Sequence, residues 1–146
     1  MKILSGSSRA SVSTVRKSLA EIVEKQSAAD AAQFSNDLFT VLAVLSSSIG
    51  LRRALTDNSR DESAKSELIA NLFGKNIGPA ANSLLTQAAS LRWSNPSEIA
   101  DAMENFAVEA ASAAADKTNE LETMESQLFD FTQVLVSNSE FRQALN

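Results

Sequence analysis

An apolar ladder without a single Gly or Pro runs through the last third of this 146-residue chain. It extends from Ile99 to Leu135, and its members follow one another at intervals of three or four residues, with Lys117 as the one polar member. This spacing is typical of one continuous α-helix with a heptad seam. At 1.5 Å per residue, roughly 40 residues give a helix about 60 Å long. We therefore expect it either to project from a small domain or to bend near 116–119.

Shorter apolar stripes at helical spacing precede the ladder and predict five further helices. The first spans about 8–25. Asp30 is the expected N-cap of the second helix, and a short helix follows around 51–55. Ser59 and Glu62 fit a capping box for the fourth helix, Gly74 would end it, and Pro79 would open the fifth. With only four Gly and two Pro in the chain, the prediction is an all-α, six-helix bundle whose long sixth helix continues into a truncated helical half-repeat.

The chain contains no His, no Cys and no Tyr. Nucleophile systems built on Ser-His-Asp or Cys-His are thereby excluded, as are zinc and iron sites built on imidazole or thiolate. The four glycines do not form a phosphate-binding loop. Carboxylates, Lys, Arg and hydroxyls remain, so we expect no cofactor and no metal, and the chain is predicted not to be an enzyme.

Charge and hydropathy narrow the class of partner. The net charge is −5, which disfavours binding to a nucleic-acid backbone. No charge-free run is both long and apolar enough to span a bilayer. The first five residues include only Ile3 and Leu4 as an apolar pair, where a signal peptide needs about seven apolar residues. The sequence predicts a soluble, intracellular helical protein without direct membrane insertion.

The sequence also repeats itself at a shift of 90 positions. Between 38–55 and 128–145, 8 of 18 positions are identical, whereas chance would give roughly one. The second copy ends where the first continues into a cap and another helix. We therefore expect a fragment of a longer protein, with an N-terminal bundle over 1–117 and a truncated second helical repeat over 118–146. In that repeat, Phe141 and Leu145 would mark a second small helix.

Several motifs together resemble the delta subunit of F-type ATP synthase, a relative of the mitochondrial oligomycin-sensitivity-conferring protein. A segment with Arg92-Trp93-Ser94 resembles the joint between helices five and six in the actinobacterial form. The resemblance covers about residues 9–146. The motifs that carry it are Asp37-Leu38-Phe39, Leu51-Arg52-Arg53-Ala54-Leu55-Thr56-Asp57, Ala64-Lys65, Leu72-Phe73-Gly74-Lys75, Leu91-Arg92-Trp93-Ser94-Asn95-Pro96-Ser97-Glu98-Ile99 and Met124-Glu125-Ser126-Gln127-Leu128-Phe129-Asp130-Phe131.

The resemblance implies a non-catalytic subunit of the peripheral stalk, or stator, on top of the catalytic head. The complex would place it peripherally at the cytoplasmic face of the plasma membrane. Its N-terminal domain would bind the N-terminal helix of an alpha subunit between helices one and five, and its C-terminal part would bind the stalk b subunit. Carried onto this chain, the alpha-binding groove would be lined by Val12, Val15, Arg16, Leu19, Val23, Leu84, Gln87, Ala88 and Leu91. Each of these residues could instead be core or plain surface.

Other features leave alternatives open. Nine of the 18 acidic residues lie between Glu98 and Asp130, and they form either a solvated helix face or a docking surface for a basic partner. Glu122 and Glu125 could be imagined as a catalytic carboxylate pair, but such a pair needs a cleft that shifts one pKa. Trp93 is either a packing plug or a binding hot spot. The alternative function is a free-standing helical adaptor or regulator that dimerises through its 120–145 face. Self-association of this fragment is a separate expectation.

Overall fold

Six helices and no strand make up the part of the chain described by the computed structural model, residues 4 and 6–145, with side chains as far as residue 137. The predicted all-α fold with a long sixth helix is confirmed. The helices are α1 (Gly6–Lys25), α2 (Ala28–Ser47), α3 (Ile49–Thr56), α4 (Glu62–Phe73), α5 (Pro79–Ser90) and α6 (Ser97–Leu145).

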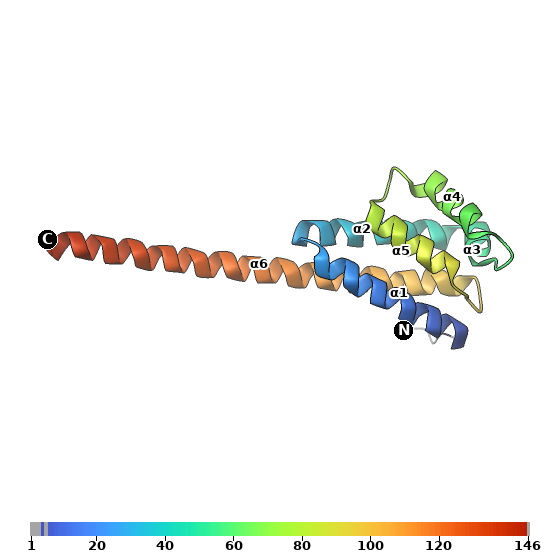
Figure 1. Cartoon of the computed structure of the whole chain (residues 1–146), viewed down its shortest axis with the longest axis horizontal. Helices are drawn as coiled ribbons and strands as arrows, with labels where there is room; N and C mark the ends of the chain where they lie inside the picture. The colour runs from blue at the N-terminus through green and yellow to red at the C-terminus, as the bar shows by residue number, and fades with distance from the viewer. Residues whose placement is uncertain (1–3, 5, 146) are drawn as a thin grey trace.

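The core lies mainly between α2 and the first half of α6, which run alongside each other (Figure 1). Phe34 and Leu38 of α2 and Met103 and Phe106 of α6 are almost completely buried. α1 packs against both α5 and α6, and α4 packs against α5. The apolar stripes read from the sequence therefore face one another, and their burial supplies the main favourable free energy of folding.

Two helix starts differ from the sequence prediction. α2 begins one turn earlier than predicted, because the Ser27 side chain accepts a hydrogen bond from the Asp30 backbone N–H at 3.1 Å. Asp30 is thus a first-turn acid rather than the N-cap. The capping box at Ser59 does not form. Ser59 instead donates from its backbone N–H and its hydroxyl to Asp57 Oδ1, in a local turn that ends before α4.

The connection from α4 to α5 depends on two glycines. Gly74 ends α4 as predicted, and a Cβ there would approach the Ala70 carbonyl oxygen to 2.4 Å, so a larger residue does not fit. Gly78 is the N-cap of α5, and Pro79 opens that helix as predicted. The Gly78 N–H donates to Asp37 Oδ2 at 2.9 Å, and Gln33 of α2 donates to Asp37 Oδ1 at 2.9 Å. This buried carboxylate joins α2 to the start of α5.

α6 does not bend between Asp116 and Asn119. It is one helix of 49 residues, about 70 Å long, and its second half projects away from the other helices (Figure 1). Lys117, the polar member of the ladder, donates from Nζ to the Gln26 carbonyl at 2.8 Å at the edge of the bundle. The separate small helix expected around Phe141 and Leu145 is wrong, since the backbone stays helical through Leu145; the side chains of these two residues lie outside the described part.

Among the described residues, no single helix is both long and apolar enough to cross a bilayer. α2 and α3 have the length and hydropathy of a membrane span only when they are taken together, and the chain turns by 106° at their junction. Leu38, Val41 and Leu45 of α2 are fully buried, so apolar side chains of this pair belong to the core of the bundle.

A buried lysine connects α4 to α5. Lys65 is 5% exposed, and its Nζ donates to the Ala89 carbonyl at 2.8 Å, in the last turn of α5, where carbonyls have no partner within the helix. Removal of the ammonium group from water lowers the pKa of Lys65 below its ordinary value of 10.5, although Asp57 and Glu62 oppose the shift.

The Asp37→Ala variant should be less stable by about 1–3 kcal/mol, because it removes the acceptor for the Gly78 and Gln33 donors in a buried place. Urea unfolding followed by circular dichroism measures the loss. Asn36→Ala changes an exposed neighbour on the same helix and serves as the control, with an expected change below about 0.5 kcal/mol. Equal stability of the two variants would contradict the role of Asp37.

The free energy of unfolding should rise with pH in the window between the lowered pKa of Lys65 and 10.5. In this window the unfolded chain binds more protons at this residue than the folded chain does, so deprotonation favours folding. The chain has no His, Cys or Tyr, so the remaining groups that can titrate near this window are the other lysines and the terminal amine. Urea unfolding from neutral pH to 10.5 should give a positive slope that Lys65→Met reduces. The exposed variant Lys17→Met should keep the slope of the parent protein.

Candidate partner-binding groove

Five of the nine residues predicted to line a groove are buried. Val15 and Ala88 have no exposed surface, and Leu84 is 1% exposed. Val12 and Leu19 of α1 are likewise part of the core cluster. These side chains hold α1 against the bundle. Leu84 reaches the edge of an open groove, whereas a partner helix could reach the other four only by displacing their neighbours.

The other four predicted residues lie nearer the surface. Arg16 points toward α6, and its Nε forms an ion pair with Glu109 Oε1 at 2.8 Å. Val23 and Leu91 are half-buried against the core. Gln87 is also half-buried, and it lines an open groove between α1 and α5. The structure therefore brings Leu84 and Gln87 together at one groove, whereas Arg16 lies at the junction of α1 with α6.

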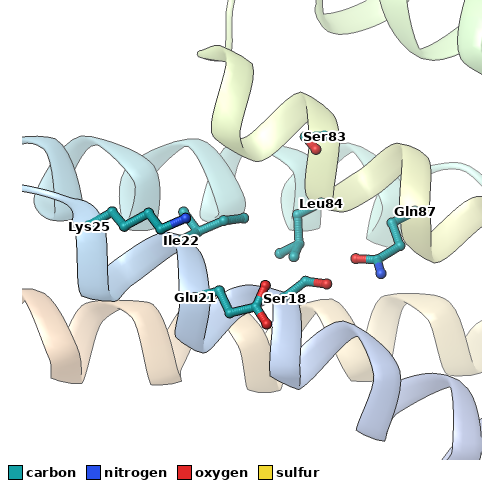
Figure 2. Close-up of a pocket in the computed structure, with 7 residues that line it drawn as sticks. All are labelled: Ser18, Glu21, Ile22, Lys25, Ser83, Leu84 and Gln87. Carbon is teal, nitrogen blue, oxygen red and sulfur yellow. The ribbon is translucent and has the colours of Figure 1, made fainter.

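The groove between α1 and α5 has a volume of about 360 Å³ (Figure 2). Leu84 extends from α5 toward α1 and forms part of its floor, together with Ile22. Polar and charged side chains surround this apolar floor. The full lining is Ser18, Glu21, Ile22, Lys25, Ser83, Leu84 and Gln87.

Five of these lining residues were not predicted: Ser18, Glu21, Ile22, Lys25 and Ser83. On α1, the open face is rotated away from the fully buried positions Val15 and Leu19. The sequence did contain a sign of these residues: polar side chains border the apolar stripe of α1 on one side. Ser18 and Lys25 stand four residues before and three residues after Ile22, so all three share one side of the helix. The sequence does not say how far α5 covers that side.

The composition of the groove suits a helix with a narrow apolar face. Two aliphatic side chains can contact apolar anchors, and two serines and Gln87 can exchange hydrogen bonds with polar positions beside them. Glu21 and Lys25 are exposed and offer one charge of each sign. The groove can therefore contact apolar side chains and, beside them, exchange hydrogen bonds or charges.

Serines near the start of α1 fix this helix to the joint between α5 and α6. Ser11 Oγ donates to the Arg92 carbonyl at 2.5 Å, and the Ser94 backbone N–H donates to Ser8 Oγ at 2.9 Å. Ser8 also donates to the carboxylate of Glu98. Because Ser8 and Ser11 are buried, these bonds satisfy polar groups that would otherwise be costly, and they set the position of one groove wall.

Trp93 packs at the same joint. Its side chain is buried, and its indole Nε1 donates to the Ala88 carbonyl at 2.8 Å near the end of α5. The structure therefore supports a packing role for Trp93 rather than a role as a binding hot spot.

The second half of α6 is rich in acidic residues. Glu120, Glu122, Glu125 and Asp130 are exposed along the projecting half of the helix. Within the described part of the chain, no three His, Cys, Asp or Glu side chains lie close enough together to hold a metal ion. Glu122 and Glu125 are not enclosed by any other element, so the cleft that a catalytic carboxylate pair needs is missing around them.

Sequence comparison relates the chain to proteins named ATP synthase subunit delta. The relative from Kineococcus radiotolerans is 39% identical over 117 residues, which are 80% of this chain and 42% of that protein. The relative from Streptomyces avermitilis is 36% identical over 140 residues, or 96% of this chain and 51% of that protein. The one from Streptomyces coelicolor is 34% identical over 145 residues, or 99% and 53%. No family model matches the chain.

The chain spans about half the length of the curated relatives that it matches. Several of them align over nearly all of this chain, from α1 into the projecting half of α6. The similarity is therefore not confined to one motif or one helix. Over this aligned part, the chain belongs to the family of actinobacterial ATP synthase delta subunits.

Proposed function

We propose that this chain acts in the stator of an F-type ATP synthase, where it binds the N-terminal helix of an alpha subunit in the groove between α1 and α5. The observation that carries the proposal is this groove, open to solvent and floored by Ile22 and Leu84, in a member of the delta-subunit family. The subunit would hold the catalytic head and take no part in the chemistry itself. The whole complex would keep it at the cytoplasmic face of the plasma membrane, with the stalk b subunit as a second partner.

Packing supports this assignment. The floor residues belong to helices that are themselves fixed: Leu84 is part of the core cluster, and α1 is held by its serines at the joint between α5 and α6. A groove whose walls are already ordered loses little conformational entropy when a partner helix binds. The alpha-subunit helix would supply the apolar anchors at i, i+3 and i+4 that the floor accepts.

Of the nine residues carried over from the family, those at the groove edge are the useful ones to test. Leu19→Asp or Leu84→Asp would place a charge in the core, and loss of binding could then reflect unfolding. Gln87 and Ser83 line the groove with their side chains partly or largely exposed, so changes there alter the groove and leave the core intact.

The Ser83→Trp variant should bind an alpha-subunit N-terminal peptide at least about tenfold more weakly than the parent chain, because the indole fills the groove. Gln87→Asp should also weaken binding, since it brings a charge beside the apolar anchors. Isothermal titration calorimetry measures both affinities. Ser13→Trp adds the same side chain at an exposed serine of α1 outside the groove lining and should change affinity less than about twofold.

Circular dichroism checks that each variant remains helical. If Ser83→Trp and Gln87→Asp bind the peptide as tightly as the parent chain, the alpha-subunit site lies elsewhere on the bundle. If the parent chain itself does not bind the peptide, the stator function is not supported. A helical adaptor, the alternative function, would give this second result.

A further inference from the structure

A second hollow lies where α4 packs against α5, whereas the groove lies between α5 and α1 (Figure 1). We call it the α4–α5 pocket. Its volume is about 260 Å³, which leaves room for several waters or a small anion, since a water molecule takes about 30 Å³ of the liquid. Its lining residues are Glu62, Lys65, Ser66, Ser83, Thr86, Gln87 and Ser90.

The α4–α5 pocket is lined by a buried cation that forms no ion pair. Lys65 is 5% exposed, and one of its three N–H donors is bonded, to the Ala89 carbonyl at 2.8 Å. Asp57 and Glu62 act on it only through their charge, because within the described residues no carboxylate lies close enough to it for an ion pair. The cost of this burial also lowers the pKa of Lys65. Two N–H donors and an unbalanced positive charge therefore remain for a ligand.

Uncharged donors lie around this cation. The Ser66 and Ser83 hydroxyls and the Gln87 side-chain amide form no hydrogen bond with any other residue that the structure describes. The other two hydroxyls of the lining already donate to acceptors within α5. Available donors therefore line the pocket from both helices, and the oxygen atoms of an anion can accept hydrogen bonds from them.

We propose that the α4–α5 pocket binds inorganic phosphate. The Lys65 ammonium group balances the negative charge of the anion, and the hydroxyls and the amide donate to its oxygens. A phosphate presents its oxygens in tetrahedral directions, which suits donors from two helices, whereas a carboxylate presents two oxygens in one plane. The site is independent of the proposed alpha-subunit groove, because Glu62, Lys65 and Ser66 do not line that groove.

Glu62 selects among the anions that could enter. Its exposed carboxylate lines the same pocket and repels an oxyanion that carries no proton. Inorganic phosphate keeps at least one proton near neutral pH, and its P–O–H group can donate to this carboxylate. Sulfate has no proton to donate, and most of a phosphomonoester has lost its second proton at pH 7. Glu62 therefore favours inorganic phosphate over anions of the same shape.

Titration of the ¹⁵N-labelled chain with inorganic phosphate at pH 7, followed by NMR, tests the proposal. Phosphate should shift the amide signals of α4 and of the last turn of α5, with a Kd of about 1–10 mM, because the ligand is small and the pocket is open. Sulfate and methyl phosphate, added at the same ionic strength, should each bind at least about fivefold more weakly.

Two pairs of matched variants of α4 test the roles of single residues. Glu62→Gln should bring the affinities for sulfate and phosphate within about twofold of each other, because the neutral amide no longer repels sulfate. Glu67→Gln changes another exposed acid of α4, outside the pocket, and should keep the selectivity of the parent chain. Ser66→Ala should weaken phosphate binding about threefold, whereas Ser63→Ala, at an exposed serine outside the lining, should not.

Lys65→Met should abolish binding, and circular dichroism shows whether this variant keeps its helices. If it does not, Glu62→Gln and Ser66→Ala still decide the question, since neither changes the core. The proposal would be overturned if phosphate shifted no signal of the pocket up to about 50 mM, or if sulfate bound the parent chain as tightly as phosphate does. Equal behaviour of the two members of each variant pair would also overturn it. None of these results bears on the alpha-subunit peptide, which is absent from the titrations.

Discussion

The packing of α2 along the first half of α6 determines where every other helix can lie. Phe34 and Leu38 on one helix and Met103 and Phe106 on the other exclude water from the centre of the bundle. The buried face of α6 also contains small residues, among them Ala102, Ala107 and Ala110, which let α2 approach closely. α1 and α5 then cover the remaining apolar surface of this pair. The open groove exists because these two covering helices do not close completely over Ile22 and Leu84.

The two halves of α6 carry the same heptad pattern with different side chains. Alanines alternate with larger residues where α2 covers the helix, whereas the ladder positions from 121 to 135 are Leu, Met and Phe alone. A ladder in a sequence indicates that a helix is continuous, because the apolar period and the absence of Gly and Pro depend on local geometry. It contains no information about which stretch has a partner within the same bundle. The ladder therefore predicts one long helix, but by itself it does not show which part of that helix other helices cover.

Elsewhere, the sequence predicts helix ends set by Gly or Pro but fails for side-chain caps and for the residues that line the groove. Gly74 and Pro79 act as predicted, since their effects follow from backbone geometry alone. Caps depend on competition between nearby side chains, and Ser27 takes the role expected of Asp30. The groove residues depend on the rotation of α1, which packing with two helices at once decides. A stripe in the sequence identifies the side of α1 that faces inward, but its edge residues are assigned only when the neighbouring helix is in place.

The groove and the projecting half of α6 lie at separate places on the molecule, and α6 is the only element that connects the bundle to that half among the described residues. Lys117 fixes this helix to the Gln26 carbonyl at the end of α1, beyond the last residues of the groove wall. The exposed side chains at 121–137 therefore touch no residue that lines the groove. A change in that half could reach the groove only through the packing of α6 in the bundle. Most of that packing is against α2, which contacts α5 in turn, and less of it is against α1.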